Sequence, residues 1–189
     1  SSCPHDLPIY HEACYEPLPM EYPMRILITA LIFATATASG ARAETFPVIK
    51  NQTVLTECGD CHMAFPPETL PEAAWQKMMA DLSNHFGEDA SLEPAPVAEI
   101  LAYYSKNSSD VSNVRAARKW RAAGSFARII DAPRFKDKHG GCTDEVWSHE
   151  KVTSKANCLA CHPTMQKDGS TDENLSFLSS KLQRQCGED

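Results

Sequence analysis

The chain has 189 residues, of which 42% are hydrophobic, and its formal net charge is −7. This length suits one modest domain or two small ones. The acidic balance argues against a nucleic-acid-binding protein, because proteins of that class carry basic surfaces that neutralise phosphates.

The first feature in chain order is a pattern typical of a secretory signal, at residues 24–43. Met24-Arg25 is a short positive start, an apolar run follows, and Ala41-Arg42-Ala43 has the A-x-A form of a cleavage site. The alternative is a membrane anchor, but the run is shorter than the ~20 residues that a spanning helix requires. We therefore expect cleavage before Glu44, a periplasmic location, and a mature chain that is not embedded in the membrane. We expect residues 1–23 to be a non-native upstream extension, with Met24 as the true start.

Helical periodicity dominates the first half of the predicted mature chain. Residues 51–58 predict a short helix, and Pro66-Pro67 ends the segment that follows it. A stronger helix is predicted over residues 71–86, with Pro71 at its first position and Gly87 as its C-terminal cap. Its apolar residues recur at three- and four-residue spacing and form one stripe. The stripe consists of Trp75, Met78, Met79, Leu82, His85 and Phe86.

Two prolines separate this helix from the next one. Pro94 and Pro96 are predicted to break the chain, and a second helix is predicted over residues 97–106, with apolar residues on one face. Residues 106–110 are polar and typical of a linker. We therefore divide the mature chain into two domains, which cover residues 44–109 and 110–189.

The second half carries the opposite charge to the first. Residues 44–110 hold 3 Lys/Arg and 11 Asp/Glu, whereas residues 111–189 hold 13 Lys/Arg and 10 Asp/Glu. A basic helix is predicted over residues 114–123, and its charge indicates either a face that steers a charged partner or an ordinary solvated surface. No strand pattern is found. The C-terminal tail is polar, with one weak apolar patch at residues 175–182.

Two CxxCH motifs carry the chemistry of the chain, at residues 58–62 and 158–162. Cysteines three apart lie about one helical turn from each other, so both thiols can reach the vinyl groups of one haem and form thioethers. The adjacent histidine then lies under the iron and supplies an imidazole nitrogen. This is the attachment spacing of c-type haem. The sequence therefore predicts two covalently attached c-type haems, bound by Cys58, Cys61, His62, Cys158, Cys161 and His162.

Two other kinds of site share part of this pattern. A redox-active C-x-x-C pair belongs in a βαβ setting, which the sequence does not predict. A zinc site built from the four motif cysteines would leave the histidine of each motif without a role. Haem attachment accounts for all the motif residues. Cys142 and Cys186 lie outside the motifs and are not expected to bind haem; in an oxidising compartment they can pair as a disulfide.

The sixth iron ligand decides what each haem can do. A side chain in that position closes the haem and suits it to electron transfer, whereas an open position binds small ligands. His85 is the candidate for the first haem because it lies on the apolar stripe, and a buried core histidine is the alternative. His139 is the candidate for the second haem, with a surface histidine as the alternative. His149 ranks third. The methionines of the stripe are interpreted as core residues.

The residues around both motifs resemble those of a known family, the small bacterial dihaem cytochromes c. The resemblance covers about residues 50–165 and is carried mainly by residues 57–67, 85–90 and 154–162, with Leu70-Pro71 and Trp75. It implies a first part similar to a class I cytochrome c, and an extended, irregular second part, each built around one haem.

The resemblance also implies ligands and partners. Both haems of the family are bis-histidine, and His85 and His139 lie where the distal ligands are expected. Redox partners are implied as well: a small oxygen-binding c-type haem protein and a membrane b-type cytochrome. Nothing is implied for the tail beyond Lys167, where the chain departs from the family pattern.

The sequence therefore predicts a mostly α-helical periplasmic electron carrier rather than an enzyme. His62 and His162 are the expected proximal iron ligands, and His85 and His139 the expected distal ones. Two histidines should give a lower reduction potential than a His/Met pair. The alternative function is a haem-based sensor or small-ligand-binding protein in which one iron keeps an open site. The two functions differ in whether His139 reaches the second iron.

Overall fold

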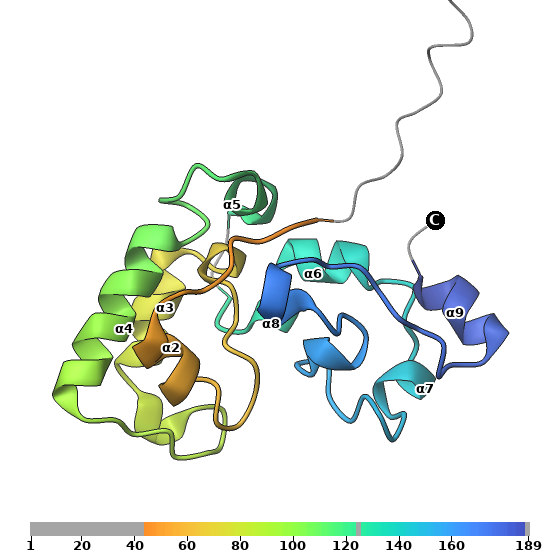
Figure 1. The fold of residues 1–189 in the computed structure, drawn as a ribbon, viewed down its shortest axis with the longest axis horizontal. Coiled ribbons are helices and arrows are strands. Elements are labelled where there is room, and N and C mark those ends of the chain that lie inside the picture. Colours follow the sequence, from red (N-terminus) through yellow and green to blue (C-terminus); the bar gives the residue numbers. More distant parts are fainter. Residues whose placement is uncertain (1–43, 124–125, 188–189) are drawn as a thin grey trace, which may run out of the picture. The chain divides into compact units, whose positions relative to one another are not determined.

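The computed structural model describes residues 44–123 and 126–187 (Figure 1). The predicted upstream extension and signal segment, residues 1–43, lie outside the described residues. Within the described ranges the regular elements are helical, and strand-like pairing is confined to two isolated bridges. The prediction of a mostly α fold is confirmed. None of the helices in the described part of the chain is long and apolar enough to cross a membrane.

The first part of the described chain contains both α-helices and 3-10 turns. α2 begins where Asn51 caps it, because the side-chain Oδ1 accepts a hydrogen bond from the backbone N–H of Val54 at 2.8 Å. This confirms the short helix predicted before the first motif. The elements are α2 Gln52–Glu57, η1 Pro67–Thr69, α3 Glu72–Met79, η2 Leu82–Asn84 and α4 Pro94–Asn107.

The helix predicted over residues 71–86 is shorter than expected. α3 ends at Met79, the 3-10 turn η2 follows, and His85 lies in a loop rather than on the helix. Asp, Ser and Asn at positions 81, 83 and 84 explain this end, because their side chains compete with the helix for backbone hydrogen bonds. Phe86 and Gly87 then have positive φ angles of 56° and 106°, which a right-handed helix does not accommodate. The prediction is wrong for residues 80–86.

α4 begins earlier than predicted because its prolines belong to the helix. Pro94 lies in the first turn, where a missing N–H costs little, since those groups have no partner within a helix. The interpretation of Pro94 and Pro96 as chain breakers is therefore wrong. α3 and α4 lie side by side (Figure 1), and the rings of Trp75 and Tyr104 are in contact, with 4.2 Å between their centroids.

The polar stretch at residues 106–110 is packed rather than exposed. Ser108 and Ser109 are buried. The N–H of Ser109 donates to the carbonyl oxygen of Leu70 at 2.9 Å, and the Ser108 hydroxyl donates to the Asp110 carboxylate at 2.8 Å. Such hydrogen bonds allow small polar residues to be buried, so the linker interpretation is wrong for these residues. The domain division that was placed there stays a prediction.

The second part consists of short helices joined by irregular chain. The basic helix predicted over residues 114–123 ends sooner, because Arg121 is extended and its guanidinium donates to two backbone carbonyls. Pro133 starts a helix, because its missing N–H costs little at the first helical position. The elements are α5 Arg115–Trp120, η3 Ile129–Asp131, α6 Pro133–Lys138, α7 Asp144–Trp147, η4 Cys158–Ala160, α8 Met165–Asp168 and α9 Ser180–Cys186.

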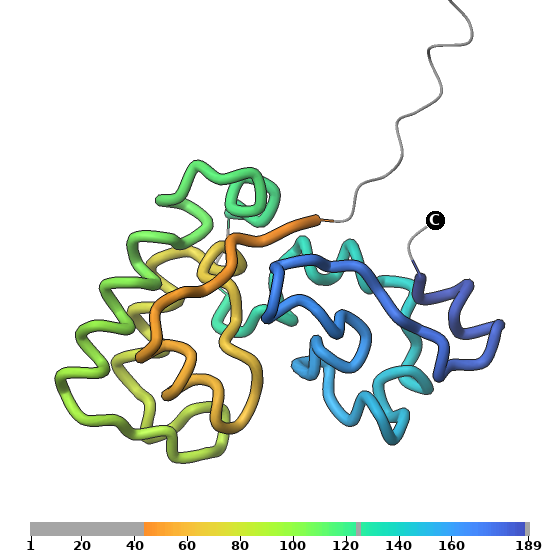
Figure 2. Tube along the Cα trace, viewed as in Figure 1, coloured from red at the N-terminus to blue at the C-terminus, as the bar shows by residue number. Residues whose placement is uncertain are grey.

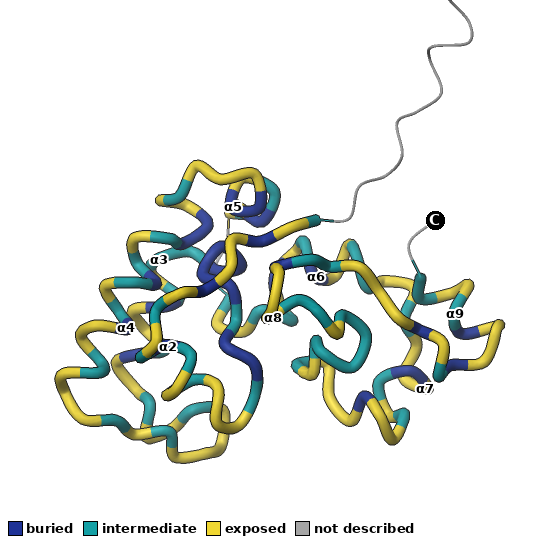
Figure 3. Tube along the Cα trace, in the orientation of Figure 1, coloured by how far each residue is buried: buried dark blue, intermediate teal, exposed yellow. Residues whose placement is uncertain are grey.

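Three hydrophobic clusters stabilise the described chain, and Figure 3 marks the buried segments of the backbone in dark blue. The first cluster packs α2, α3 and α4 around Leu70 and Ile100, which are fully buried. The second cluster joins α5 and α6 to Phe46 from the N-terminal segment. The third gathers Val146 of α7 with leucines of the predicted apolar patch, including Leu182 of α9. Burial of these side chains is the main favourable term for a chain of this kind.

A disulfide between Cys142 and Cys186 lies beside the third cluster. It fastens the end of α9 to the chain that precedes α7. The pairing predicted for these two cysteines is confirmed.

The segment after residue 44 pairs with chain far away in sequence. In Figure 2 this segment, drawn in orange, runs beside the chain near α8. The N–H of Phe46 donates to the carbonyl oxygen of Gly169 at 2.8 Å, and Thr45 and Ser170 form an antiparallel bridge. Gly169 has a φ of +76°, and a Cβ there would lie 1.9 Å from the carbonyl oxygen of Phe46. Only glycine allows this approach.

Candidate functional site

The first motif begins at the C-terminus of α2. Cys58 caps that helix and packs, half-buried, against the first cluster, whereas Cys61 is exposed. Burial raises the pKa of the Cys58 thiol, and a hydrogen bond with Tyr104 opposes the shift. Gly59 permits the turn between the cysteines, because a Cβ on it would lie 2.1 Å from the carbonyl oxygen of Leu55. The motif therefore offers one half-buried and one exposed thiol.

His62 faces a second histidine. Its Nδ1 lies 2.7 Å from the carbonyl oxygen of Met63, and because a carbonyl can only accept, Nδ1 donates. Phe65 stacks on the His62 ring with 4.8 Å between centroids. The His85 ring lies 6.1 Å from the His62 ring, with an angle of 22° between their planes. The structure thus brings together the two histidines that the sequence assigns to the first haem.

His85 is held by a tight loop. Its backbone forms an isolated bridge with Glu88, and its ring contacts Phe86 at 4.9 Å between centroids. The guanidinium of Arg128 lies over the Phe86 ring, 4.4 Å from the centroid. Within the described residues Nδ1 of His85 is buried without a hydrogen-bond partner. Burial lowers the pKa of His85, and the charges of His62 and Arg128 lower it further. These shifts favour the neutral imidazole, which is the metal-binding form.

The second motif lies on the 3-10 turn η4. Burial raises the pKa of the Cys158 thiol to about 11 and also raises that of Cys161. Nδ1 of His162 lies 2.8 Å from the carbonyl oxygen of Thr171 and donates to it. The His139 ring lies 6.1 Å from the His162 ring, with an angle of 89° between their planes. The structure thus brings together the two histidines that the sequence assigns to the second haem.

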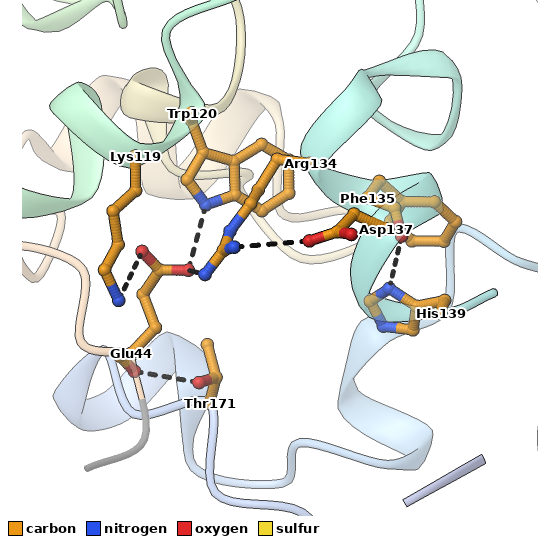
Figure 4. A network of polar contacts seen from close by, with 8 residues as sticks. All are labelled: Glu44, Lys119, Trp120, Arg134, Phe135, Asp137, His139 and Thr171. Carbon is orange, nitrogen blue, oxygen red and sulfur yellow. Dashed lines mark hydrogen bonds and ion pairs between the residues drawn. The ribbon is translucent and has the colours of Figure 1, made fainter. Parts of the chain in front are cut away.

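His139 is positioned by α6. It caps the C-terminus of that helix, and its Nδ1 donates to the carbonyl oxygen of Phe135 at 3.0 Å (Figure 4). The His139 ring stacks on the Phe135 ring at 4.2 Å and lies 6.0 Å from the Trp147 ring. Residues four apart are neighbours on a helix, so the contact with Phe135 follows from the local structure.

The remaining candidates lie elsewhere. His149 packs on Phe177 with 5.1 Å between ring centroids, and its Nδ1 accepts a hydrogen bond from the N–H of Lys151. The motif cysteines belong to different clusters, since Cys58 packs on the first and Cys161 on the third. Across residues 44–123 and 126–187, no group of three or more His, Cys, Asp or Glu side chains is arranged to hold a metal ion.

Both histidine pairs have the spacing that one iron atom requires. An imidazole nitrogen binds a first-row metal at about 2 Å, so two rings on opposite sides of one metal have centroids roughly 6 Å apart. The observed separation is 6.1 Å in each pair. In three of the four rings Nδ1 donates to a backbone carbonyl, which fixes the tautomer and leaves Nε2 for the metal. With the free motif cysteines nearby, these residues fit a c-type haem at each motif.

A helical chain in which each of two CxxCH motifs lies beside a histidine pair has the features of a c-type cytochrome. The family model for dihaem cytochrome c matches residues 54–169, which include both motifs. The chain belongs to the dihaem cytochrome c family. Among curated proteins no match was found.

Solved structures of dihaem cytochromes are similar to this chain. A diheme cytochrome c from Rhodobacter sphaeroides is 42% identical over 64% of this chain and 96% of that chain, with a TM-score of 0.54. A diheme cytochrome type c from Shewanella baltica is 30% identical over 64% of this chain and 86% of that chain, with a TM-score of 0.52. The predicted family and the prediction of two covalently attached c-type haems are confirmed. Family membership gives the chain a haem-based electron-carrier role.

Several residues that support the histidines were not found by sequence reasoning. The contact between Phe135 and His139 could have been predicted from the sequence, because Phe135 lies four residues before His139 in a helical stretch. The contact between Thr171 and His162 could not have been predicted, since Thr171 lies nine residues after His162 in irregular chain. The acceptor for such a histidine is a backbone carbonyl, and any residue type provides one.

Proposed function

We propose that the chain is a periplasmic dihaem c-type cytochrome that passes electrons between redox partners through two low-spin bis-histidine haems. The observation that carries the proposal is that each motif histidine has a second histidine beside it, with 6.1 Å between the two ring centroids in each pair. The residues proposed to hold the first haem are Cys58, Cys61, His62 and His85, and those proposed for the second are Cys158, Cys161, His162 and His139.

The residues of the chain set how the haems work. Bound haem iron supplies the one-electron chemistry. The Nδ1–H groups of His62 and His162 donate to backbone carbonyls, which makes each imidazole a stronger donor and favours ferric iron. With two histidines as its iron ligands, each haem would have a lower potential than with a His/Met pair. If His85 and His139 bind the two irons, neither iron would keep a site for a reactant, and the chain would carry electrons rather than act as an enzyme.

Charge supports the docking of a cationic partner on the first part. Apart from the buried Glu68, nine carboxylates lie between residues 57 and 110, and none of them forms an ion pair with another described residue. An uncompensated acidic surface attracts a partner with a basic patch. The proposed partners are those that the family resemblance implies, a small oxygen-binding c-type haem protein and a membrane b-type cytochrome.

Optical and EPR spectra of the oxidised holoprotein test the proposed ligation. We expect two low-spin haems with nitrogen ligands on both sides of each iron. A high-spin signal from one haem in the native protein would contradict the proposal, and it would favour a sensor or small-ligand-binding function.

The proposed location has its own test. N-terminal sequencing of the protein exported by its native host should begin at or near Glu44, because the A-x-A site precedes that residue. Finding residues 1–23 on the exported protein would contradict the proposed signal.

A further inference from the structure

Glu44, which is not a proposed haem ligand, is linked through neighbouring residues to both sides of the second histidine pair. The side chain of Glu44 is only 11% exposed, although this residue begins the described chain. Figure 4 shows its carboxylate among side chains of α5 and α6, and its backbone beside Thr171. Because a charged side chain is rarely buried unless it is paired, the contacts of Glu44 indicate what it does.

The backbone of Glu44 supports the motif histidine through Thr171. The carbonyl oxygen of Glu44 accepts two hydrogen bonds from Thr171, one from the N–H and one from the hydroxyl, both at 2.9 Å. The carbonyl oxygen of Thr171 in turn accepts the Nδ1–H of His162 at 2.8 Å. A shift of Thr171 would therefore move the acceptor that orients the His162 ring.

The carboxylate of Glu44 supports the opposite histidine through α6. Its Oε2 accepts hydrogen bonds from Nη2 of Arg134 at 3.5 Å and from Nε1 of Trp120 at 3.3 Å. Arg134 lies on α6, and His139 caps the C-terminus of that helix. Because Nδ1 of His139 donates to a carbonyl of the same helix, the orientation of its ring follows α6.

Partial burial makes this contact sensitive to the loss of either partner. The side chains of Glu44 and Arg134 are 11% and 21% exposed, and Lys119 forms a second ion pair with Glu44 at 3.6 Å. Removing Glu44 leaves Arg134 with only its ion pair to the exposed Asp137, and removing Arg134 leaves Lys119 as the remaining ion-pair partner of Glu44 among the described residues. Lys119 lies on α5, to which no haem ligand has been assigned, so its pair with Glu44 provides a matched control.

From these contacts we infer that Glu44 is a positioning residue for both axial ligands of the second haem. Its backbone holds the acceptor of His162, and its carboxylate holds the helix that carries His139. The inference rests on the proposed bis-histidine ligation of that haem and extends it. The angle between the two rings is then set in part by a residue 127 positions before Thr171.

The test compares four variants of the holoprotein by EPR and by potentiometric titration. They are Glu44→Ala, Arg134→Met, the double variant of both, and Lys119→Met. The signals are assigned beforehand with His85→Ala, which alters the first haem. We expect Glu44→Ala and Arg134→Met each to shift the g values and the midpoint potential of the second haem and to leave the first unchanged. The double variant should shift by less than the sum of the two single variants, because both changes break the contact between Glu44 and Arg134.

The control separates positioning from a general loss of packing. Lys119→Met removes a charge beside the same carboxylate, and we expect it to leave the second haem unchanged. Equal shifts in Lys119→Met and Glu44→Ala, or shifts of both haems, would overturn the inference. Unchanged g values and potential of the second haem in Glu44→Ala would also overturn it.

Two further outcomes are distinguishable. If Glu44→Ala fails to take up haem, Glu44→Gln, which keeps the size of the side chain, serves the same comparison: a shift confined to the second haem supports the inference, and no shift overturns it. If the unaltered protein lacks two nitrogen ligands on the second iron, the proposed function fails first, before Glu44 is tested.

Discussion

The two histidine pairs are equally spaced but differently oriented. The ring centroids are 6.1 Å apart in both, yet the ring planes meet at 22° in the first pair and at 89° in the second. Nearly parallel imidazole planes keep the two π-interacting d orbitals of iron unequal in energy, whereas perpendicular planes make them nearly equal. The two proposed haems should therefore differ in electronic structure although they share the same ligands.

The difference follows from the elements that carry His85 and His139, the histidines proposed as distal ligands. His85 lies in a loop, where the bridge to Glu88 and the contact with Phe86 fix it. His139 caps a helix and stacks on Phe135, so the direction of α6 sets its ring plane. The local sequence therefore determines which residue types face each other, whereas the angle between their rings depends on tertiary contacts.

The largest expected effect comes from removing the attachment cysteines of one site. Replacing Cys158 and Cys161 by alanine should abolish covalent attachment of the second haem, because no thiol then remains to form the thioethers. The first haem should stay attached. Mass spectrometry of the purified chain counts the haems directly, and the reciprocal change at Cys58 and Cys61 is the matched variant. Two covalent haems in either variant would contradict the assignment of the sites.

Removing a distal ligand should change the spin state of one haem only. In His85→Ala the first haem should become high-spin or water-bound, and in His139→Ala the second should do so, because each loses one imidazole. Optical and EPR spectra report the change. His149→Ala is the control, since that ring packs on Phe177 instead. If the His85→Ala variant keeps two low-spin bis-histidine haems, His85 is a core histidine and not an iron ligand.

The disulfide should stabilise the second part and not the first. Replacing Cys142 and Cys186 by alanine opens a loop with a sequence separation of 44. A link of this kind contributes about 2–4 kcal/mol to the free energy of unfolding. We expect denaturant unfolding monitored at the second haem to shift to lower denaturant, while the first haem responds much less. Equal shifts at both haems would mean that the two parts unfold as one unit.

The first part contains a buried acid whose stability effect depends on pH. Glu68 is 2% exposed, and burial raises its pKa from 4.5 to about 7. A raised folded-state pKa contributes stability that is fully present below pH 4.5 and is lost as the pH rises through about 7. Glu68→Gln should therefore be more stable than the unaltered protein at pH 8, by at most about 3 kcal/mol, and similar to it at pH 4.

Denaturant unfolding at the two pH values measures this effect, and Glu57→Gln, at an exposed acid, is the control. The same gain at pH 4 and at pH 8 would show that the ionisation of Glu68 is not the cause.

The sequence predicts the family and its two haems better than it predicts the helix boundaries between the motifs. The CxxCH motifs are local, so their spacing alone is enough to predict which residues attach the haems. The loop at His85 is less accessible to sequence reasoning, because apolar periodicity continues past the polar residues that end α3. Pro94 has the same difficulty, since proline both breaks a helix and starts one. The role of Glu44 depends on a contact 127 residues away, and no local pattern encodes it.

The low-temperature EPR spectrum of the fully oxidised holoprotein tests the central claim most directly. Two bis-histidine haems with ring planes at 22° and 89° should give two low-spin signals of different shape. The first haem should give a rhombic signal, and the second a highly anisotropic signal with a larger maximum g value. Two low-spin signals of the same shape, or a high-spin signal from either haem, would contradict this account.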